Sequence, residues 1–181
     1  MKATVLHGSP RKGKNSDILA EHFLKGFNST GEHSVGHFYI NDLTIAPCQG
    51  CMSCGKPPHD CKIDDDMQPI YKSYKESDLI LWVSPMYWGY LTAQLKLVQD
   101  RMEALACSGF DDKTFAVLLT YRHHYQSTAS MFERIAPHFN IDLHILECCT
   151  KHPETGRDIP VEELPEKLDE AYNLGLKLGK A

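Results

Sequence analysis

Four cysteines crowd into one short stretch of the chain: Cys48, Cys51, Cys54 and Cys61. Thiolates at this spacing can surround a single compact ion or cluster. The Cys-x2-Cys-x2-Cys portion lets three sulfurs converge on one face of an iron-sulfur cubane, with the fourth supplied from further along. Zinc is more often held by two separated Cys-x2-Cys pairs, and free or disulfide-forming thiols without metal are the third alternative. The pattern predicts metal or redox chemistry in this segment.

A second candidate site is the loop at residues 8–16, between an apolar run at residues 2–7 and a helical pattern that begins near Asp17. Its polar side chains are Ser9, Arg11, Asn15 and Ser16. The helix that follows adds unpaired N–H groups and the positive end of its dipole, so a phosphate suits this loop. The spacing matches neither the Walker A motif nor the dinucleotide fingerprint. In the alternative interpretation the glycines only turn the chain and Ser16 caps the helix.

A third candidate segment, residues 84–90, follows a continuous apolar run at residues 79–83. It carries Pro85, Met86, Tyr87 and Trp88. A flat conjugated ring needs apolar walls together with backbone donors and acceptors, and an exposed loop of this composition supplies both. The alternative is that Tyr87 and Trp88 pack beneath the next helix.

The elements that would position these loops alternate between strands and helices. Strands are expected at residues 2–7, 35–40, 79–83, 113–120 and 141–146. Helices are expected at residues 16–27, from the acidic run 64–66 onward, at 93–106 after a Thr92 cap, at 126–138 and at 164–178. This alternation predicts an α/β fold, a parallel five-stranded sheet with helices on both faces. The flavodoxin-like strand order 2-1-3-4-5 would bring the loops after strands one and three together across a crevice.

Both loops resemble those of the flavodoxin-like NAD(P)H-dependent FMN reductase family, through Gly-Ser-Pro-Arg with Asn-Ser at residues 8–16 and Ser-Pro-x-Tyr-Trp at residues 84–88. The resemblance covers about residues 1–140. It implies that the first loop holds the FMN phosphate and the second lies along the flavin ring. A third loop of that family closes over the flavin; here it is the stretch 120–125, which starts at Thr120 and has no glycine.

The cysteine segment resembles that of the iron-sulfur flavoproteins, a branch of the same superfamily that carries a [4Fe-4S] cluster near FMN. Many plain FMN reductases have similar cysteines without a cluster. The resemblance implies an FMN-dependent oxidoreductase that takes hydride from NAD(P)H and passes electrons to a flavin, a quinone or a protein. No single catalytic side chain stands out. An electron carrier without NAD(P)H activity and a non-enzymatic metal-binding module are the alternatives, and a homodimer or homotetramer is implied.

Composition limits the remaining possibilities. A chain of 181 residues with a net charge of −5 is most simply one domain, residues 1–181, with a cysteine-rich insertion at residues 43–63. The charge argues against nucleic-acid or membrane partners. No leader or long apolar run is visible, so we expect a soluble cytoplasmic protein. The other three cysteines are expected to be buried, as small apolar side chains usually are; they are Cys107, Cys148 and Cys149.

Overall fold

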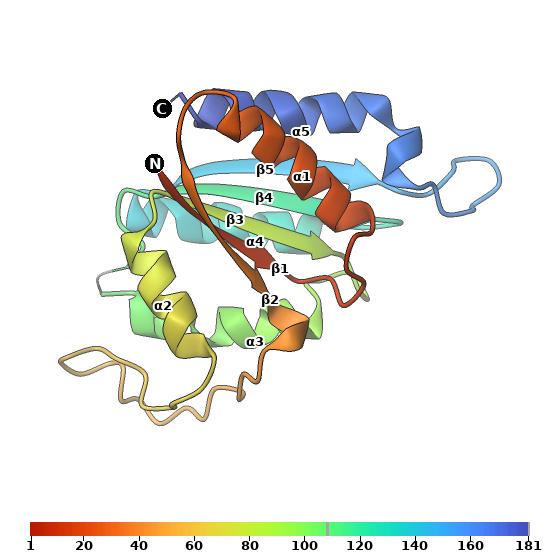
Figure 1. Ribbon diagram of the computed structural model, residues 1–181. Coiled ribbons are helices and arrows are strands. Elements are labelled where there is room, and N and C mark those ends of the chain that lie inside the picture. Colours follow the sequence, from red (N-terminus) through yellow and green to blue (C-terminus); the bar gives the residue numbers. More distant parts are fainter. Residues whose placement is uncertain (108, 181) are drawn as a thin grey trace.

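The computed structural model describes residues 1–107 and 109–180, and its centre is a five-stranded parallel sheet (Figure 1). The strands are β1 (Lys2–His7), β2 (Ser34–Tyr39), β3 (Leu79–Pro85), β4 (Thr114–Tyr121) and β5 (Asp142–Cys149). The α-helices are α1 (Asn15–Asn28), α2 (Met67–Glu76), α3 (Ala93–Arg101), α4 (Gln126–Ile135) and α5 (Pro165–Leu178). Short 3-10 helices are η1 (Ile40–Asp42), η2 (Met102–Leu105), η3 (Ala136–Phe139) and η4 (Val161–Glu163). The sheet order β2-β1-β3-β4-β5 confirms the predicted topology.

Helices cover both faces of the sheet, as the alternating pattern predicts. Helices α1 and α5 lie on one face, and α2, α3 and α4 lie on the other (Figure 1). Each layer encloses its own hydrophobic core against the strands. Strand β3 runs through the middle, and every one of its residues is buried. That burial explains why its sequence is a continuous apolar run rather than an alternating one.

Three predicted boundaries differ from the observed ones. The α-helix expected to reach residue 106 ends at Arg101 and continues as the 3-10 helix η2. Helix α4 likewise changes to η3, where Pro137 lacks the N–H that an α-helix would use and clashes with the preceding turn. Strand β5 extends three residues beyond the expected end, to Cys149, because it pairs with β4 as far as Tyr121. The polar Glu147 interrupts the apolar alternation there, and it accepts a hydrogen bond from the Tyr121 hydroxyl.

The predicted helix starts are confirmed at two places. Thr92 caps α3 by accepting a hydrogen bond from the Leu95 amide. The acidic run 64–66 immediately precedes α2, and Asp65 accepts a hydrogen bond from the Met67 amide. Its negative charge therefore lies at the positive end of the helix dipole.

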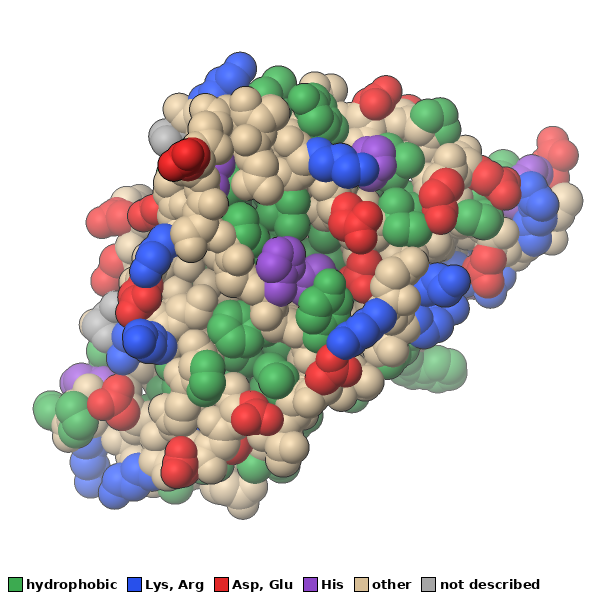
Figure 2. Space-filling model, in the orientation of Figure 1, with side chains coloured by type: hydrophobic (Ala, Val, Ile, Leu, Met, Phe, Trp, Pro, Cys, Tyr) green, Lys and Arg blue, Asp and Glu red, His purple; other side chains and the backbone are tan. Residues whose placement is uncertain are grey.

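The surface mixes charges of both signs. On the face shown in Figure 2, lysine and arginine side chains alternate with acidic ones. Among the residues that the structure describes, no helix combines the length and the apolar composition needed to cross a membrane.

Candidate functional site

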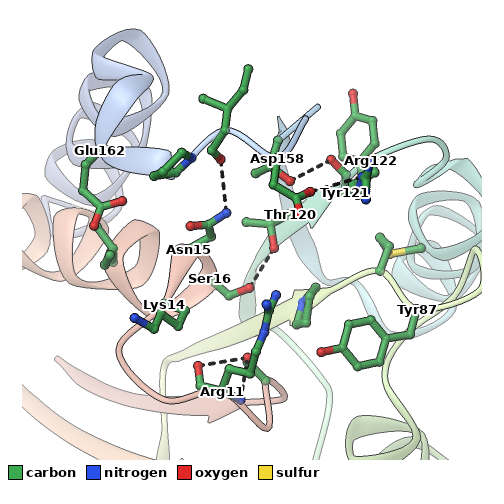
Figure 3. Close-up of a pocket in the computed structure, with 17 residues that line it drawn as sticks. Arg11, Lys14, Asn15, Ser16, Tyr87, Thr120, Tyr121, Arg122, Asp158 and Glu162 are labelled. Carbon is green, nitrogen blue, oxygen red and sulfur yellow. Dashed lines mark hydrogen bonds and ion pairs between the residues drawn. The ribbon is translucent and has the colours of Figure 1, made fainter. Parts of the chain in front are cut away.

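A cavity of about 530 Å³ opens at the carboxyl ends of the strands, where the three predicted loops meet (Figure 3). In open α/β sheets, ligands bind at this edge. All side chains predicted for the cofactor except Trp88 line it: Ser9, Arg11, Asn15, Ser16, Pro85, Met86, Tyr87 and Thr120. Sequence positions more than 100 residues apart therefore surround one space.

Gly8 allows the first loop to sit directly on the start of α3. The Gly8 amide donates to the Val83 carbonyl at 2.8 Å, and the Gly8 carbonyl accepts a hydrogen bond from the Thr92 hydroxyl at 2.8 Å. A Cβ at this position would lie 2.2 Å from Cδ1 of Leu95, which is far inside contact distance. A glycine is needed here for close approach, and the approach fixes the first loop against the second.

Two hydroxyls of the first loop have structural partners. The Ser9 hydroxyl accepts the amide of Arg11 at 3.1 Å and so shapes the turn. Ser16 and Thr120 share a hydrogen bond of 2.7 Å between their buried hydroxyls, which joins α1 to the end of β4. The interpretation of Ser16 as the helix cap is wrong, because the N-cap position is Lys14 and no side chain caps it.

Asn15 connects the first loop to the segment that follows β5. Its amide nitrogen donates to the Ile159 carbonyl at 3.4 Å (Figure 3). Its amide oxygen accepts from the Val161 amide at 3.3 Å. Both ends of this side chain are therefore in use. Asn15 positions the wall of the cavity.

Arg11 is the charged group best placed to receive an anion. Its side chain points into the cavity in Figure 3, and in the described part of the chain it makes no ion pair. Lys14 also lines the cavity. Arg122, by contrast, is bound to Asp158 at 3.2 Å and to the Gly156 carbonyl at 2.7 Å. Two positive side chains that make no ion pair with any described residue, Arg11 and Lys14, thus lie at the loop that begins α1.

The second loop supplies an apolar wall and one outlying aromatic. Tyr87 and Tyr90 pair across a tight hairpin, whose tip residues Trp88 and Gly89 have positive φ angles of 51° and 79°. The Trp88 side chain is fully exposed and does not line the cavity, so the alternative that it packs beneath the next helix is wrong. Its contact with a flavin ring stays a prediction.

The rest of the cavity wall was not among the predicted site residues. It comprises Lys14, Ile18, Tyr121, Arg122, Thr150, Asp158, Ile159, Pro160 and Glu162. The signal that could have found the later ones is topological, because the segment after β5 leaves the sheet at the same edge as the other loops. His123 and His124, in the stretch 120–125, are exposed.

The four clustered cysteines line one small cavity of about 80 Å³, beside Arg101 and Ala104. All of them are free thiols, and the chain around them is irregular. Within residues 1–107 and 109–180, no three Cys, His, Asp or Glu side chains are close enough to hold a metal ion. The loop thus brings the four cysteines to the wall of one cavity, but among the described residues they do not form a finished ligand set.

An ion pair fixes both ends of this cysteine segment. The guanidinium of Arg101 binds Asp65 through two contacts, of 2.8 and 3.1 Å, and donates to the Ala46 carbonyl at 2.9 Å. Burial disfavours the Asp65 charge, but the hydrogen bonds from Arg101 and from the Ala46 and Met67 amides outweigh it and hold the pKa of Asp65 below its ordinary value. The residues before Cys48 and after Cys61 are thereby held together.

The donor chemistry of these side chains, rather than their present arrangement, suits an iron-sulfur cluster. Soft thiolates are the ligands that such clusters take. In the described part of the chain, the buried Nε of Arg101 has no hydrogen-bond partner, and Arg101 lines the same cavity as the thiols. An anionic group in this cavity would lie beside the buried Arg101 guanidinium and could accept a hydrogen bond from its Nε–H.

The remaining cysteines differ from one another. Cys148 is buried, and burial raises the pKa of its thiol to about 12. Cys149 is half-buried. The expectation of burial is wrong for Cys107, which is exposed because the chain has already left η2.

Comparison with known proteins places the chain in a family. Residues 1–141 match the family described as NADPH-dependent FMN reductase. An iron-sulfur flavoprotein of Methanosarcina thermophila is 36% identical over 110 residues, which are 61% of this chain and 56% of that protein. The chain spans about half the length of the curated relatives it matches.

Two solved structures show the same fold at low identity. An FMN-dependent NADH-azoreductase from Bacillus anthracis, in complex with FMN, superposes with a TM-score of 0.73 at 13% identity, covering 99% of this chain and 100% of that one. A flavodoxin from the domain Archaea gives a TM-score of 0.61 at 16% identity, covering 99% and 97%. With most of its length matched and its sheet in the flavodoxin order, the chain belongs to the NADPH-dependent FMN reductase family.

Proposed function

We propose that the protein is an FMN-dependent oxidoreductase that uses NAD(P)H. The observation that supports this most is the convergence on one cavity of the α1 N-terminus, the apolar Pro85–Tyr87 wall and Arg11, which makes no ion pair within the described part of the chain. A phosphate suits the first two features, and a flat ring suits the third. Bound FMN would supply the chemistry, which is hydride transfer from NAD(P)H and onward delivery of electrons to a flavin, a quinone or a protein.

The chain's own residues act by binding and positioning. Arg11 and the backbone N–H groups at the start of α1 hold the phosphate, and the loop shape set by Ser9 presents them. The pair Ser16 and Thr120 ties the phosphate end of the cavity to β4. Met86 and Tyr87 exclude water from one side of the ring. No side chain is assigned an acid-base role.

A second function is favoured by the cysteine cavity. The four cysteines line one cavity beside Arg101, whose Nε–H has no hydrogen-bond partner among the described residues. This donor set suits a [4Fe-4S] cluster held by Cys48, Cys51, Cys54 and Cys61. The named iron-sulfur flavoproteins among the relatives support it. With such a cluster the protein would carry electrons between redox partners, with or without its own NAD(P)H activity.

Self-association is part of the proposal. Trp88 presents a large apolar surface to solvent at the rim of the cofactor cavity, and Tyr87 beside it is 42% exposed. Exposed aromatics at the edge of a site are typical of protein contacts. A homodimer or homotetramer that covers this rim is the assembly we infer.

Anaerobic purification followed by a visible spectrum and metal analysis tests both functions. Flavin absorbance with oxidation of NADPH or NADH is the expected result for the oxidoreductase. A broad charge-transfer band beneath the flavin peaks, with about four irons and acid-labile sulfides per chain, supports the cluster. A yellow, iron-free protein would leave the cysteines as thiols. A colourless protein with zinc would contradict both proposals.

A further inference from the structure

A buried, hydrogen-bonded His–Asp pair lies behind the phosphate loop, outside the cavity. His7 ends β1 and Asp17 stands in the first turn of α1, and each side chain is only 4% exposed. Nδ1 of His7 lies 2.9 Å from Oδ1 of Asp17. A carboxylate can only accept, so the Nδ1 of His7 carries the proton in this bond.

The other oxygen of Asp17 reaches into the loop itself. Oδ2 accepts the amide of Gly13 at 2.7 Å. Asp17 therefore shapes the same loop that offers Arg11 to an anion. A buried negative charge at the back of an anion-binding loop opposes the ligand unless a positive charge compensates it.

A hydrogen-bonded path connects this pair to solvent. Nε2 of His7 lies 3.1 Å from Nδ1 of His37, which is exposed on the edge strand β2. Tyr39 stacks on the His7 ring at a centroid distance of 4.2 Å and holds it in place. A proton taken up by His37 can thus place positive charge next to Asp17 by moving along two imidazoles.

The other charges around this group balance one another. Lys12 lies 4.5 Å above the Tyr39 ring and pairs with Asp42 of η1. Burial raises the pKa of Tyr39, and the negative charges of Asp42 and of Glu21 on α1 raise it further. Burial, and then the neighbouring His7, lower the pKa of His37. A phosphate anion bound in the loop would add negative charge near the two histidines and favour the form in which one of them is protonated.

We propose that Asp17, His7 and His37 form a proton relay that couples phosphate binding in the loop 8–16 to uptake of one proton from solvent at His37. The inference rests on the proposed FMN site. Asp17 and His7 are positioning residues, and they act on the ligand through the loop. The proton enters at His37 and passes to His7, where its positive charge compensates Asp17. No bond to the ligand is made or broken.

Calorimetric titration of the full chain with FMN at several pH values, in buffers of different ionisation enthalpy, counts the protons exchanged on binding. His37→Gln keeps a donor for His7 but cannot titrate. We expect wild type to take up more protons than H37Q, by up to one per FMN, with affinity changing by at most about tenfold per pH unit. The titration of the FMN phosphate is common to both proteins and cancels.

His144 offers a matched control, because it also pairs with an aspartate, Asp142, but on β5. H144Q should behave as wild type, and riboflavin, which lacks the phosphate, should show no difference between wild type and H37Q. Asp17→Asn should likewise abolish the extra uptake. Equal proton counts for FMN in wild type, H37Q and D17N, with binding intact, would overturn the relay alone. Failure of wild type to bind FMN would overturn the proposed function and the relay with it.

Discussion

Arg11 and Arg122 show how two arginines in one cavity come to have different roles. Arg122 is occupied by Asp158 and the Gly156 carbonyl, whereas Arg11 makes no ion pair among the described residues. The sequence analysis selected Arg11 because it lies in a loop at a helix start, where an anion is favoured. The partner of Arg122, Asp158, lies 36 positions further along the chain, and no local pattern in the sequence reveals it.

Replacing Arg11 with Ala should weaken FMN binding about tenfold or more, because hydrogen bonds to charged groups contribute roughly 1.5–3 kcal/mol. Fluorescence titration measures the affinity. Lys12→Ala is the matched control, since Lys12 is in the same loop but pairs with Asp42 and does not line the cavity. Unchanged affinity of R11A would count against Arg11 as the phosphate ligand.

Trp88 can be tested by its own fluorescence. The chain has two tryptophans, and Trp82 is buried whereas Trp88 is fully exposed. In Trp82→Phe the single remaining indole should emit as a solvated group and be strongly quenched when FMN is added, if it lies along the ring. The variant Trp88→Phe reports on Trp82 for comparison. No quenching in W82F despite bound flavin would place Trp88 away from the cofactor.

The cysteine segment is held as a unit by contacts at its two ends. Arg101, at the end of α3, binds Asp65 and the Ala46 carbonyl, while the stretch between has no helix or strand. The spacing of the cysteines was visible in the sequence. The clamp was not, because Arg101 lies in a helix far from the acidic run and only the packing of α3 against it brings them together.

Cys51→Ser should remove bound iron if the segment holds a cluster, because loss of one thiolate leaves three ligands. Iron and acid-labile sulfide in anaerobically purified protein measure the effect. Cys107→Ser is the control, being an exposed thiol outside the segment. Iron content in C51S equal to that of wild type would reject the assignment of this ligand.

Asp65 should make stability depend on pH in the acid range. Its pKa in the folded chain is below the ordinary value of 3.8, so its contribution is fully present above that value and is lost as pH falls through the lower, folded-state pKa. Asp65→Asn leaves Arg101 buried without its charge partner, and should cost about 3–5 kcal/mol at neutral pH. Urea unfolding at pH 7 and pH 3 should show a smaller difference between D65N and wild type at the lower pH; a constant difference would contradict this account.

At the scale of the whole molecule, the sheet order and the two helical layers followed from the sequence. Alternating strands and helices leave few topologies, and the apolar run of β3 identified the central strand. The crossing of α1 and α5 could not be predicted. A Cβ on Gly26 would lie 1.9 Å from the Tyr172 carbonyl oxygen, so the two backbones touch. A glycine within a helical pattern does not reveal which other helix packs against it, so the contact of α1 with the last helix was not visible in the sequence.

Gly26→Ala should therefore destabilise the fold, by about 1–3 kcal/mol as expected for overpacking, and α1 should shift at the cofactor loop. Thermal or urea unfolding measures the change. Gly36→Ala is the control, because a Cβ there would have its nearest neighbour at 3.4 Å. If G26A is as stable as G36A, the two helices have room to separate and the close crossing is not required.

Asn15 joins the cofactor loop to backbone 146 positions away, in the stretch that follows β5. That stretch lies beyond residue 141, where the match to the family ends, yet it forms part of the cavity wall. During divergence, substitutions there can adjust what the cavity accepts while the family's loops stay unchanged. The part of the chain that follows the family match is thus a place where substitutions would change the choice of substrate.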